Sequence, residues 1–204
     1  MKHFEQVAGF ILAGGQSSRM GCDKALLEIA GVPLLVRTVR LLEPRVAGVT
    51  VIGAPERYAA LGLCVVPDDR AGLGPLGGIA TALRISLSEW NLVVGCDLPY
   101  LTGEWLDWLI ARARASPADA VVPESARGLE PLCAIYRARC APTLAAALAR
   151  GVRKATDAVA APAMEKVTAG QWRAFDVGGA LFQNMNTPAD YQQARARLEG
   201  QAAG

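Results

Sequence analysis

Long apolar runs are missing from this 204-residue chain. None approaches the ~20 consecutive apolar residues that cross a bilayer, so we expect no membrane contact. The first six residues, MKHFEQ, lack the apolar region of a signal peptide, which favours a cytoplasmic protein. A basic stripe is missing too, because 21 Lys and Arg are balanced by 19 Asp and Glu without any long basic run. We therefore expect no nucleic-acid partner.

Cysteine is sparse and irregularly placed. The chain has five cysteines, an odd number, and no Cys-x-x-C pair. This spacing predicts reduced thiols and no zinc site. The cysteines are Cys22, Cys64, Cys96, Cys133 and Cys140.

Hydrophobic residues make up 52% of the chain, enough for one core, and we expect one domain over residues 1–204. Short apolar runs alternate with amphipathic stretches, which predicts an α/β three-layer αβα sandwich around a Rossmann-like, mostly parallel sheet. The expected strands are 7–12, 49–52, 64–66, 92–95, 120–122 and 132–136. The expected helices are 33–42, 76–87, 103–115, 138–149 and 188–198. For residues 160–174 we expect only a short strand and a loop.

A glycine-rich segment, ILAGGQSSRMGCDK, follows the first expected strand at residues 11–24. Its glycines let backbone N–H groups approach a polyphosphate, and Arg19 and Lys24 supply positive charge. The alternative is a glycine-rich turn with scattered surface charge. A Walker A loop is excluded, because two residues separate Gly21 from Lys24. A dinucleotide fingerprint is excluded because Gly14 and Gly15 are adjacent.

Two further segments place carboxylates after expected strands. Asp97 follows the apolar run 92–95 and is suited to holding Mg²⁺ together with substrate phosphates, or else it is only a turn residue. Asp68 and Asp69 precede a glycine-rich helix start, where one carboxylate could accept two hydrogen bonds from a guanine base. They could instead form a solvated turn, and the sequence does not decide which of the two faces the ligand.

Two amides near the C-terminus, Asn184 and Asn186, precede the last expected helix. Their functional interpretation is acceptor-substrate binding, and their structural interpretation is a helix entry. Thr187 is suited to the N-cap of that helix, and Pro188 to its first turn.

Residues 11–24 resemble the signature of sugar-nucleotide-type nucleotidyltransferases. With GPLGG at 74–78, CDLP at 96–99, EPLCAIY at 130–136 and NMNTP at 184–188, the chain resembles the molybdenum cofactor guanylyltransferase family over about residues 7–195. The resemblance implies the fold of nucleotide-diphospho-sugar transferases. It also implies transfer of GMP from GTP to molybdopterin with release of pyrophosphate, and Mg²⁺ as cofactor. Transient contact with molybdopterin-delivering or molybdoenzyme-maturation proteins is expected as well.

The same resemblance implies roles for individual residues. The nucleotide-binding residues are Leu12, Ala13, Gly14, Gly15, Lys24, Asp68 and Asp97. Asp97 also ligates the metal, and Arg19, Lys24 and Asp97 form the catalytic set. The chain departs from the family pattern at Gly53, where the family often carries an asparagine. Glycine cannot make the side-chain contact to the nucleotide that the asparagine would make, so CTP remains an alternative nucleotide.

The implied nucleophile is an already anionic phosphate, so no general base is expected, in agreement with a single histidine, His3. The rival functions are cytidylyl transfer to molybdopterin, transfer to another phosphorylated acceptor, and non-catalytic nucleotide binding.

Overall fold

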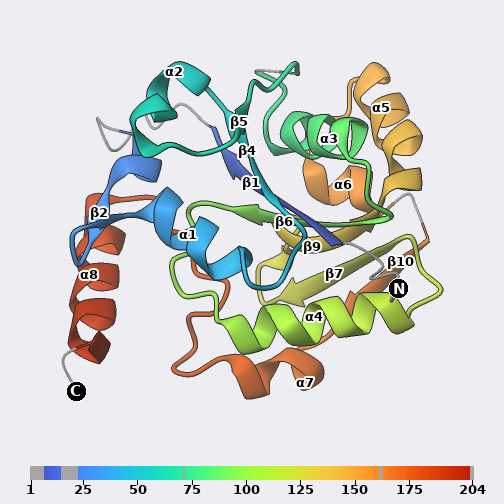
Figure 1. Ribbon diagram of the computed structural model, residues 1–204. Helices are drawn as coiled ribbons and strands as arrows, with labels where there is room; N and C mark the ends of the chain where they lie inside the picture. The colour runs from blue at the N-terminus through green and yellow to red at the C-terminus, as the bar shows by residue number, and fades with distance from the viewer. Residues whose placement is uncertain (1–6, 15–22, 71, 161–162, 203–204) are drawn as a thin grey trace, which may run out of the picture.

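The computed structural model describes residues 7–14, 23–70, 72–160 and 163–202. In this part of the chain, eight strands form one sheet in the order β10-β7-β9-β6-β1-β4-β5, with β8 paired to β7 (Figure 1). The strands are β1 Val7–Ala13, β4 Val49–Gly53, β5 Val65–Val66, β6 Trp90–Gly95, β7 Ala120–Ser125, β8 Gly128–Leu129, β9 Cys133–Arg137 and β10 Met164–Val167. Two short strands, β2 (Glu28–Ile29) and β3 (Val32–Pro33), form a separate hairpin.

The sheet is mostly parallel, as predicted. Strand β1 lies parallel between β4 and β6, β5 continues parallel to β4, and β10 is parallel to β7. Strand β9 runs antiparallel to both β6 and β7. The chain extends the sheet from β1 to β4 and β5 and then returns to β6 on the other side of β1. The strand order therefore reverses between β1 and β6, where ligands of open α/β sheets bind at the carboxyl ends.

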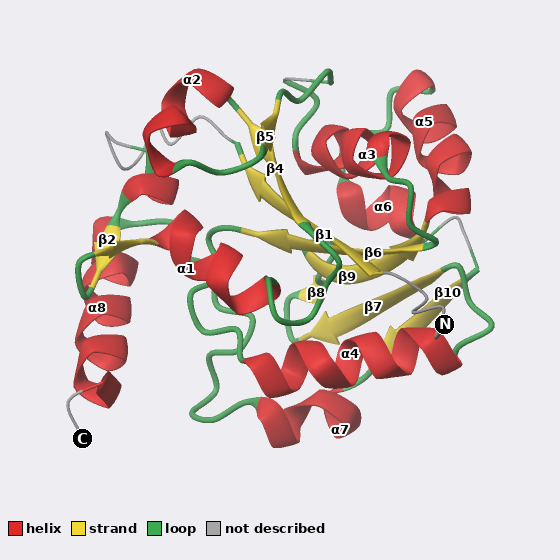
Figure 2. Cartoon of the chain, viewed as in Figure 1, coloured by secondary structure: helices red, strands yellow, loops and turns green. Residues whose placement is uncertain are grey.

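Helices cover both faces of the sheet (Figure 2). They are α1 Leu34–Leu42, α2 Pro55–Tyr58, α3 Pro75–Ile85, α4 Gly103–Ala115, α5 Ala141–Ala149, α6 Ala155–Val159, α7 Ala169–Trp172 and α8 Pro188–Ala202. One buried cluster packs α1, α2, α4 and α7 against one face, and a second packs α3, α5 and α6 against the other. This arrangement confirms the predicted αβα sandwich.

Local sequence explains the main elements. All six residues of β6 are buried, as the apolar run predicts for a strand covered on both faces. Helix α1 buries Leu34, Leu35, Thr38, Val39 and Leu42, a spacing that gives one apolar helix face. Helix α8 packs beside β2, where Ala194 and Ile29 share a buried cluster with Met185 from the segment before the helix.

The structure differs from expectation between residues 160 and 174. The short strand is confirmed as β10, but helix α7 stands where we expected a loop. A capping box between Thr168 and Gln171 starts this helix, and Trp172 anchors it in the core. Within the described ranges, no helix combines the length and apolar character needed to cross a bilayer.

Candidate active site

The carboxyl ends of β1 and β6 lie side by side. Leu12 is in register with Gly95, and the Cys96 backbone N–H donates to the Leu12 carbonyl at 3.2 Å. Leu12 and Ala13 are buried, whereas Gly14 is exposed at the end of β1. Sequence reasoning placed nucleotide contacts here. Two of its site residues, Gly15 and Arg19, lie outside the described residues.

Asp97 lies two residues beyond the end of β6 and is half-buried. A side chain at Gly95 would place Cβ 2.8 Å from Asp97 Oδ1, so the glycine leaves room for the carboxylate. The Asn184 amide nitrogen lies 3.4 Å from Asp97 Oδ2, and the Met185 N–H donates to the Asp97 carbonyl at 2.9 Å. Burial raises the pKa of Asp97, and the positive charge of Lys24 opposes that rise. This carboxylate is rigidly held next to a cation.

Lys24 is the first residue of a short 3₁₀ helix, Lys24–Leu26. The side chain of Asp23 caps this helix by accepting from the Ala25 N–H at 3.0 Å. Lys24 Nζ donates to Asn186 Oδ1 at 2.7 Å. The structure therefore brings together Lys24, Asp97, Asn184 and Asn186, which we call the Asp97 cluster.

The helix entry that carries Asn186 is itself fixed by Asp190. One oxygen of the Asp190 carboxylate accepts from the backbone N–H groups of Asn186 and Thr187, each at 2.8 Å. These bonds lower the pKa of Asp190. Thr187 Oγ1 accepts from the Asp190 N–H at 3.1 Å, which confirms the predicted N-cap. This segment is therefore a helix entry, as its structural interpretation predicts, and it also contributes to the Asp97 cluster.

Arg127 is a residue that sequence reasoning missed. It lies in the turn between β7 and β8 and donates to Asn184 Oδ1 at 3.1 Å and to the Phe182 carbonyl. Glu130, 3.4 Å from Arg127, accepts from Ser125 Oγ at 2.6 Å and supports the same turn. Arg127 thereby orients Asn184 toward Asp97. A single arginine in a turn carries no periodic signal, so only the tertiary structure reveals this contact.

Asp68 and Asp69 differ in their contacts. Asp68 Oδ1 accepts from the Arg70 N–H at 2.9 Å and from Thr81 Oγ1 at 2.8 Å. Asp69 also accepts from Thr81 and pairs with Arg84 at 2.8 Å. The Thr81 hydrogen bond, helped by Arg84, lowers the pKa of Asp69. Within the described ranges, Asp68 Oδ2 has no protein partner, so Asp68 is the carboxylate with an oxygen free for a ligand.

The glycines of this region permit close approach. A Cβ at Gly78 would lie 3.0 Å from Leu12, and one at Gly77 would lie 2.7 Å from the Arg70 carbonyl. At Gly53, a Cβ would lie 2.5 Å from the Ala13 carbonyl oxygen. Glycine at this position is therefore required by the close approach of β1 and β4 at their carboxyl ends.

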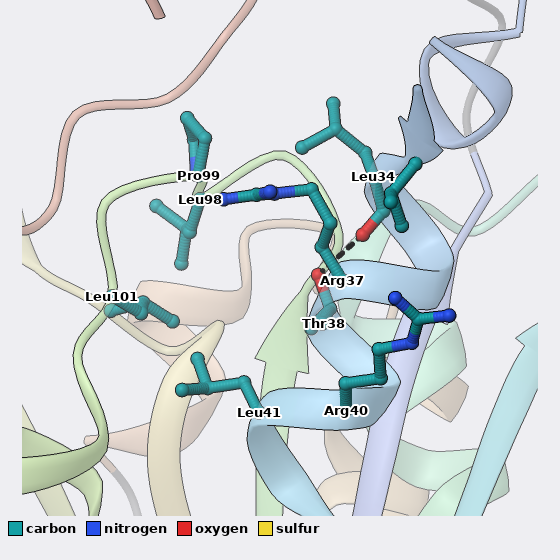
Figure 3. Close-up of a pocket in the computed structure, with 9 residues that line it drawn as sticks. Leu34, Arg37, Thr38, Arg40, Leu41, Leu98, Pro99 and Leu101 are labelled. Carbon is teal, nitrogen blue, oxygen red and sulfur yellow. Dashed lines mark hydrogen bonds between the residues drawn. The ribbon is translucent and has the colours of Figure 1, made fainter. Parts of the chain in front are cut away.

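A surface pocket of about 300 Å³ lies between α1 and the loop that follows β6. Leu34, Leu41 and Leu98 give it apolar walls, and Arg37 extends beside Leu98 and Pro99 (Figure 3). None of the predicted site residues lines this pocket.

The donor set can hold a metal only together with a substrate. In the part of the chain that the structure describes, no three His, Cys, Asp or Glu side chains are grouped closely enough to bind a metal ion. Asp97 is a carboxylate next to the Asn184 amide. That set fits Mg²⁺, which binds through one or two carboxylates plus substrate phosphates and retains water.

Comparison with known proteins identifies relatives along most of the chain. The family model described as MobA-like NTP transferase domain matches residues 9–165. A relative from Pelotomaculum thermopropionicum, named probable molybdenum cofactor guanylyltransferase, is 36% identical over 98% of this chain and 97% of its own. One of the same name from Deinococcus radiodurans is 38% identical over 93% and 94%.

A solved structure agrees with these relatives. The molybdopterin-guanine dinucleotide biosynthesis protein A from Archaeoglobus fulgidus superposes with a TM-score of 0.82 at 25% identity. The match covers 95% of this chain and 99% of that one.

Proposed function

Because this chain belongs to the MobA-like NTP transferase family, we propose that it transfers GMP from GTP to molybdopterin and releases pyrophosphate. The observation that carries the proposal is the Asp97 cluster, where a half-buried carboxylate and a lysine lie close together at the switch point of the sheet. The names of the relatives supply the substrates.

We assign the phosphates to the end of β1 and the Asp97 cluster. Lys24 neutralises phosphate charge, and Leu12, Ala13 and Gly14 line the nucleotide at the end of β1. We also assign Gly15 to nucleotide binding and Arg19 to neutralising phosphate charge. Asp68 accepts hydrogen bonds from the guanine through its free oxygen.

We assign the metal to Asp97. The carboxylate would hold Mg²⁺, which supplies charge stabilisation at the reacting phosphates. Lys24 adds a fixed positive charge, so that little charge reorganisation is needed during transfer.

The acceptor approaches from the side of Asn184 and Asn186 in this proposal. Both amides are fixed, one by Arg127 and the other by Lys24, so they can position an anionic nucleophile without neutralising it. The nucleophile is the terminal phosphate of molybdopterin. It displaces pyrophosphate at the α-phosphorus, and because it is already an anion it needs no general base.

The second candidate is transfer of CMP from CTP, or transfer to another phosphorylated acceptor. Gly53 is the observation behind it, because glycine offers no side chain to read the base. Thermal unfolding with Mg²⁺ and each nucleoside triphosphate separates the candidates. A ligand at 100 times its Kd stabilises by about 2.7 kcal/mol. We expect GTP to raise Tm more than CTP or ATP, and pyrophosphate release to require GTP, molybdopterin and Mg²⁺ together.

Equal protection by all triphosphates, or pyrophosphate release without molybdopterin, would overturn guanylyl transfer. We also propose transient contact with proteins that deliver molybdopterin or mature molybdoenzymes. The cytoplasm is the proposed location. The four described cysteines are free thiols, as is usual for proteins of reducing compartments, and this supports the assignment.

A further inference from the structure

The hydroxyl group of Tyr58 contacts both ends of the glycine-rich segment. Tyr58 is the last residue of α2, and its side chain is 1% exposed. Its oxygen lies 3.1 Å from the Ala13 carbonyl oxygen and 3.0 Å from Asp23 Oδ2. Ala13 is the last residue of β1, and Asp23 caps the short helix that begins with Lys24. One side chain from a third element thus joins the strand end to Asp23, the residue before the lysine.

The Tyr58 hydroxyl is protonated at neutral pH. Burial raises the pKa of Tyr58, and the Asp23 carboxylate raises it further. The single proton is shared between two acceptors, a carbonyl and a carboxylate. Arg57, 3.7 Å from Asp23, adds positive charge on the exposed side. Tyr58 is therefore a hydrogen-bond donor and not an acid or base.

The backbone makes room for this ring. A Cβ at Gly53 would lie 2.9 Å from Tyr58 Cε2 as well as 2.5 Å from the Ala13 carbonyl. Any side chain at position 53 would push the ring or the end of β1 aside. The glycine that departs from the family pattern thus permits the contact between Tyr58 and Ala13.

We propose that Tyr58 is a positioning residue that fixes Lys24 relative to the end of β1, and so sets the span across which the phosphates of the nucleotide bind. This inference rests on the proposed function for the identity of the ligand. Tyr58 acts through Asp23: the tyrosine orients the carboxylate, the carboxylate caps the Lys24 helix, and the helix places Nζ in the Asp97 cluster.

The first test is Tyr58→Phe, which keeps the ring and removes both hydrogen bonds. Lys24 contacts the bound nucleotide before and during transfer, so a misplaced Lys24 should raise KM for GTP about tenfold and lower kcat by a smaller factor. The pH dependence of the rate should be the same as in the wild type on both its acidic and its alkaline side, because Tyr58 does not titrate in that range.

Tyr136→Phe is the matched control. Tyr136 is also fully buried and donates one hydrogen bond, to the Pro131 carbonyl at 2.8 Å, but it lies on β9. We expect this variant to lower Tm without changing KM. A rise in KM of equal size in both variants would overturn the positioning role, because it would show a general effect of stability.

The second test needs no nucleotide. Hydrogen exchange of the backbone N–H groups of Ala25, Leu26 and Leu27 reports the Lys24 helix, since all three are hydrogen bonded there. Tyr58→Phe should speed their exchange about tenfold, Asp23→Ala should do the same, and Tyr136→Phe should not. This measurement is valid even if GTP is not the substrate. Failure of the proposed function can therefore be distinguished from failure of the inference about Tyr58.

Two results would each overturn the inference. Unchanged exchange in Tyr58→Phe would show that the hydroxyl does not hold the Lys24 helix. Faster exchange with an unchanged KM would show that fixing the Lys24 helix does not affect nucleotide binding. Asp23→Ala removes the cap itself, so its exchange rate gives the upper limit against which Tyr58→Phe is compared.

Discussion

Lys24 and Asn186 are 162 positions apart in sequence, yet Lys24 Nζ lies 2.7 Å from Asn186 Oδ1. The contact joins the helix that follows the glycine-rich loop to the entry of α8, near the C-terminus. Since Asn184 contacts Asp97 from the same entry, the two amides bridge the lysine and the carboxylate. A segment near the C-terminus thereby completes the candidate site.

Lys24→Ala should weaken GTP binding and slow transfer. The loop then loses a charge-assisted contact worth about 1.5–3 kcal/mol, which corresponds to a roughly 10- to 150-fold rise in KM. Steady-state kinetics at fixed Mg²⁺ measures it. Lys166→Ala is the control, because Lys166 pairs with Glu124 at 2.9 Å on the edge strand β10 and should leave KM unchanged. An unchanged KM in Lys24→Ala would contradict the phosphate assignment.

Asp97→Asn should be the most damaging single change at the site. It keeps the size of the side chain and removes the charge that would hold Mg²⁺, so turnover should fall about 10²–10³-fold. The assay is rate against Mg²⁺ concentration, with Tm as the folding control. Asp107→Asn, on the exposed side of α4, should show normal turnover. Normal turnover in Asp97→Asn would reduce Asp97 to a turn residue.

Asp68→Asn should relax the preference for GTP over ATP about tenfold, because an NH₂ donor replaces the free acceptor oxygen when the amide oxygen keeps the bonds from Arg70 and Thr81. Asp69→Asn should not, since Asp69 is already paired with Arg84. The ratio of kcat/KM for the two nucleotides checks both variants. The opposite ranking would assign base reading to Asp69.

Asp190→Asn tests the α8 entry through its pH dependence. The folded state lowers the pKa of Asp190, so the carboxylate stabilises the protein above its unfolded pKa of about 3.9. That stabilisation is lost as the pH falls through the lower folded pKa. At pH 7 the variant should melt about 1–3 °C below the wild type. The difference in Tm between the two proteins should disappear in acid. A difference that persists at pH 2 would contradict the charge-based role.

Local pattern was enough for much of the fold. The buried run of β6 and the apolar face of α1 identify themselves by periodicity, because burial of each element depends on its own residues. The place of Asp97 after an apolar strand follows in the same way. The capping box at Thr168 was equally local, and α7 could have been predicted from it.

The sequence by itself determined the alternation of strands and helices, the family, and the carboxylates and glycines at the strand ends. Only the tertiary structure decided that β9 runs antiparallel, that Arg127 orients Asn184, and that Asp69 rather than Asp68 is paired with Arg84. It also placed Tyr58 between Ala13 and Asp23. The physical reason is that periodicity reports which face of an element is buried. Contacts between polar side chains from distant segments depend instead on how those elements pack, and they leave no periodic trace in the chain.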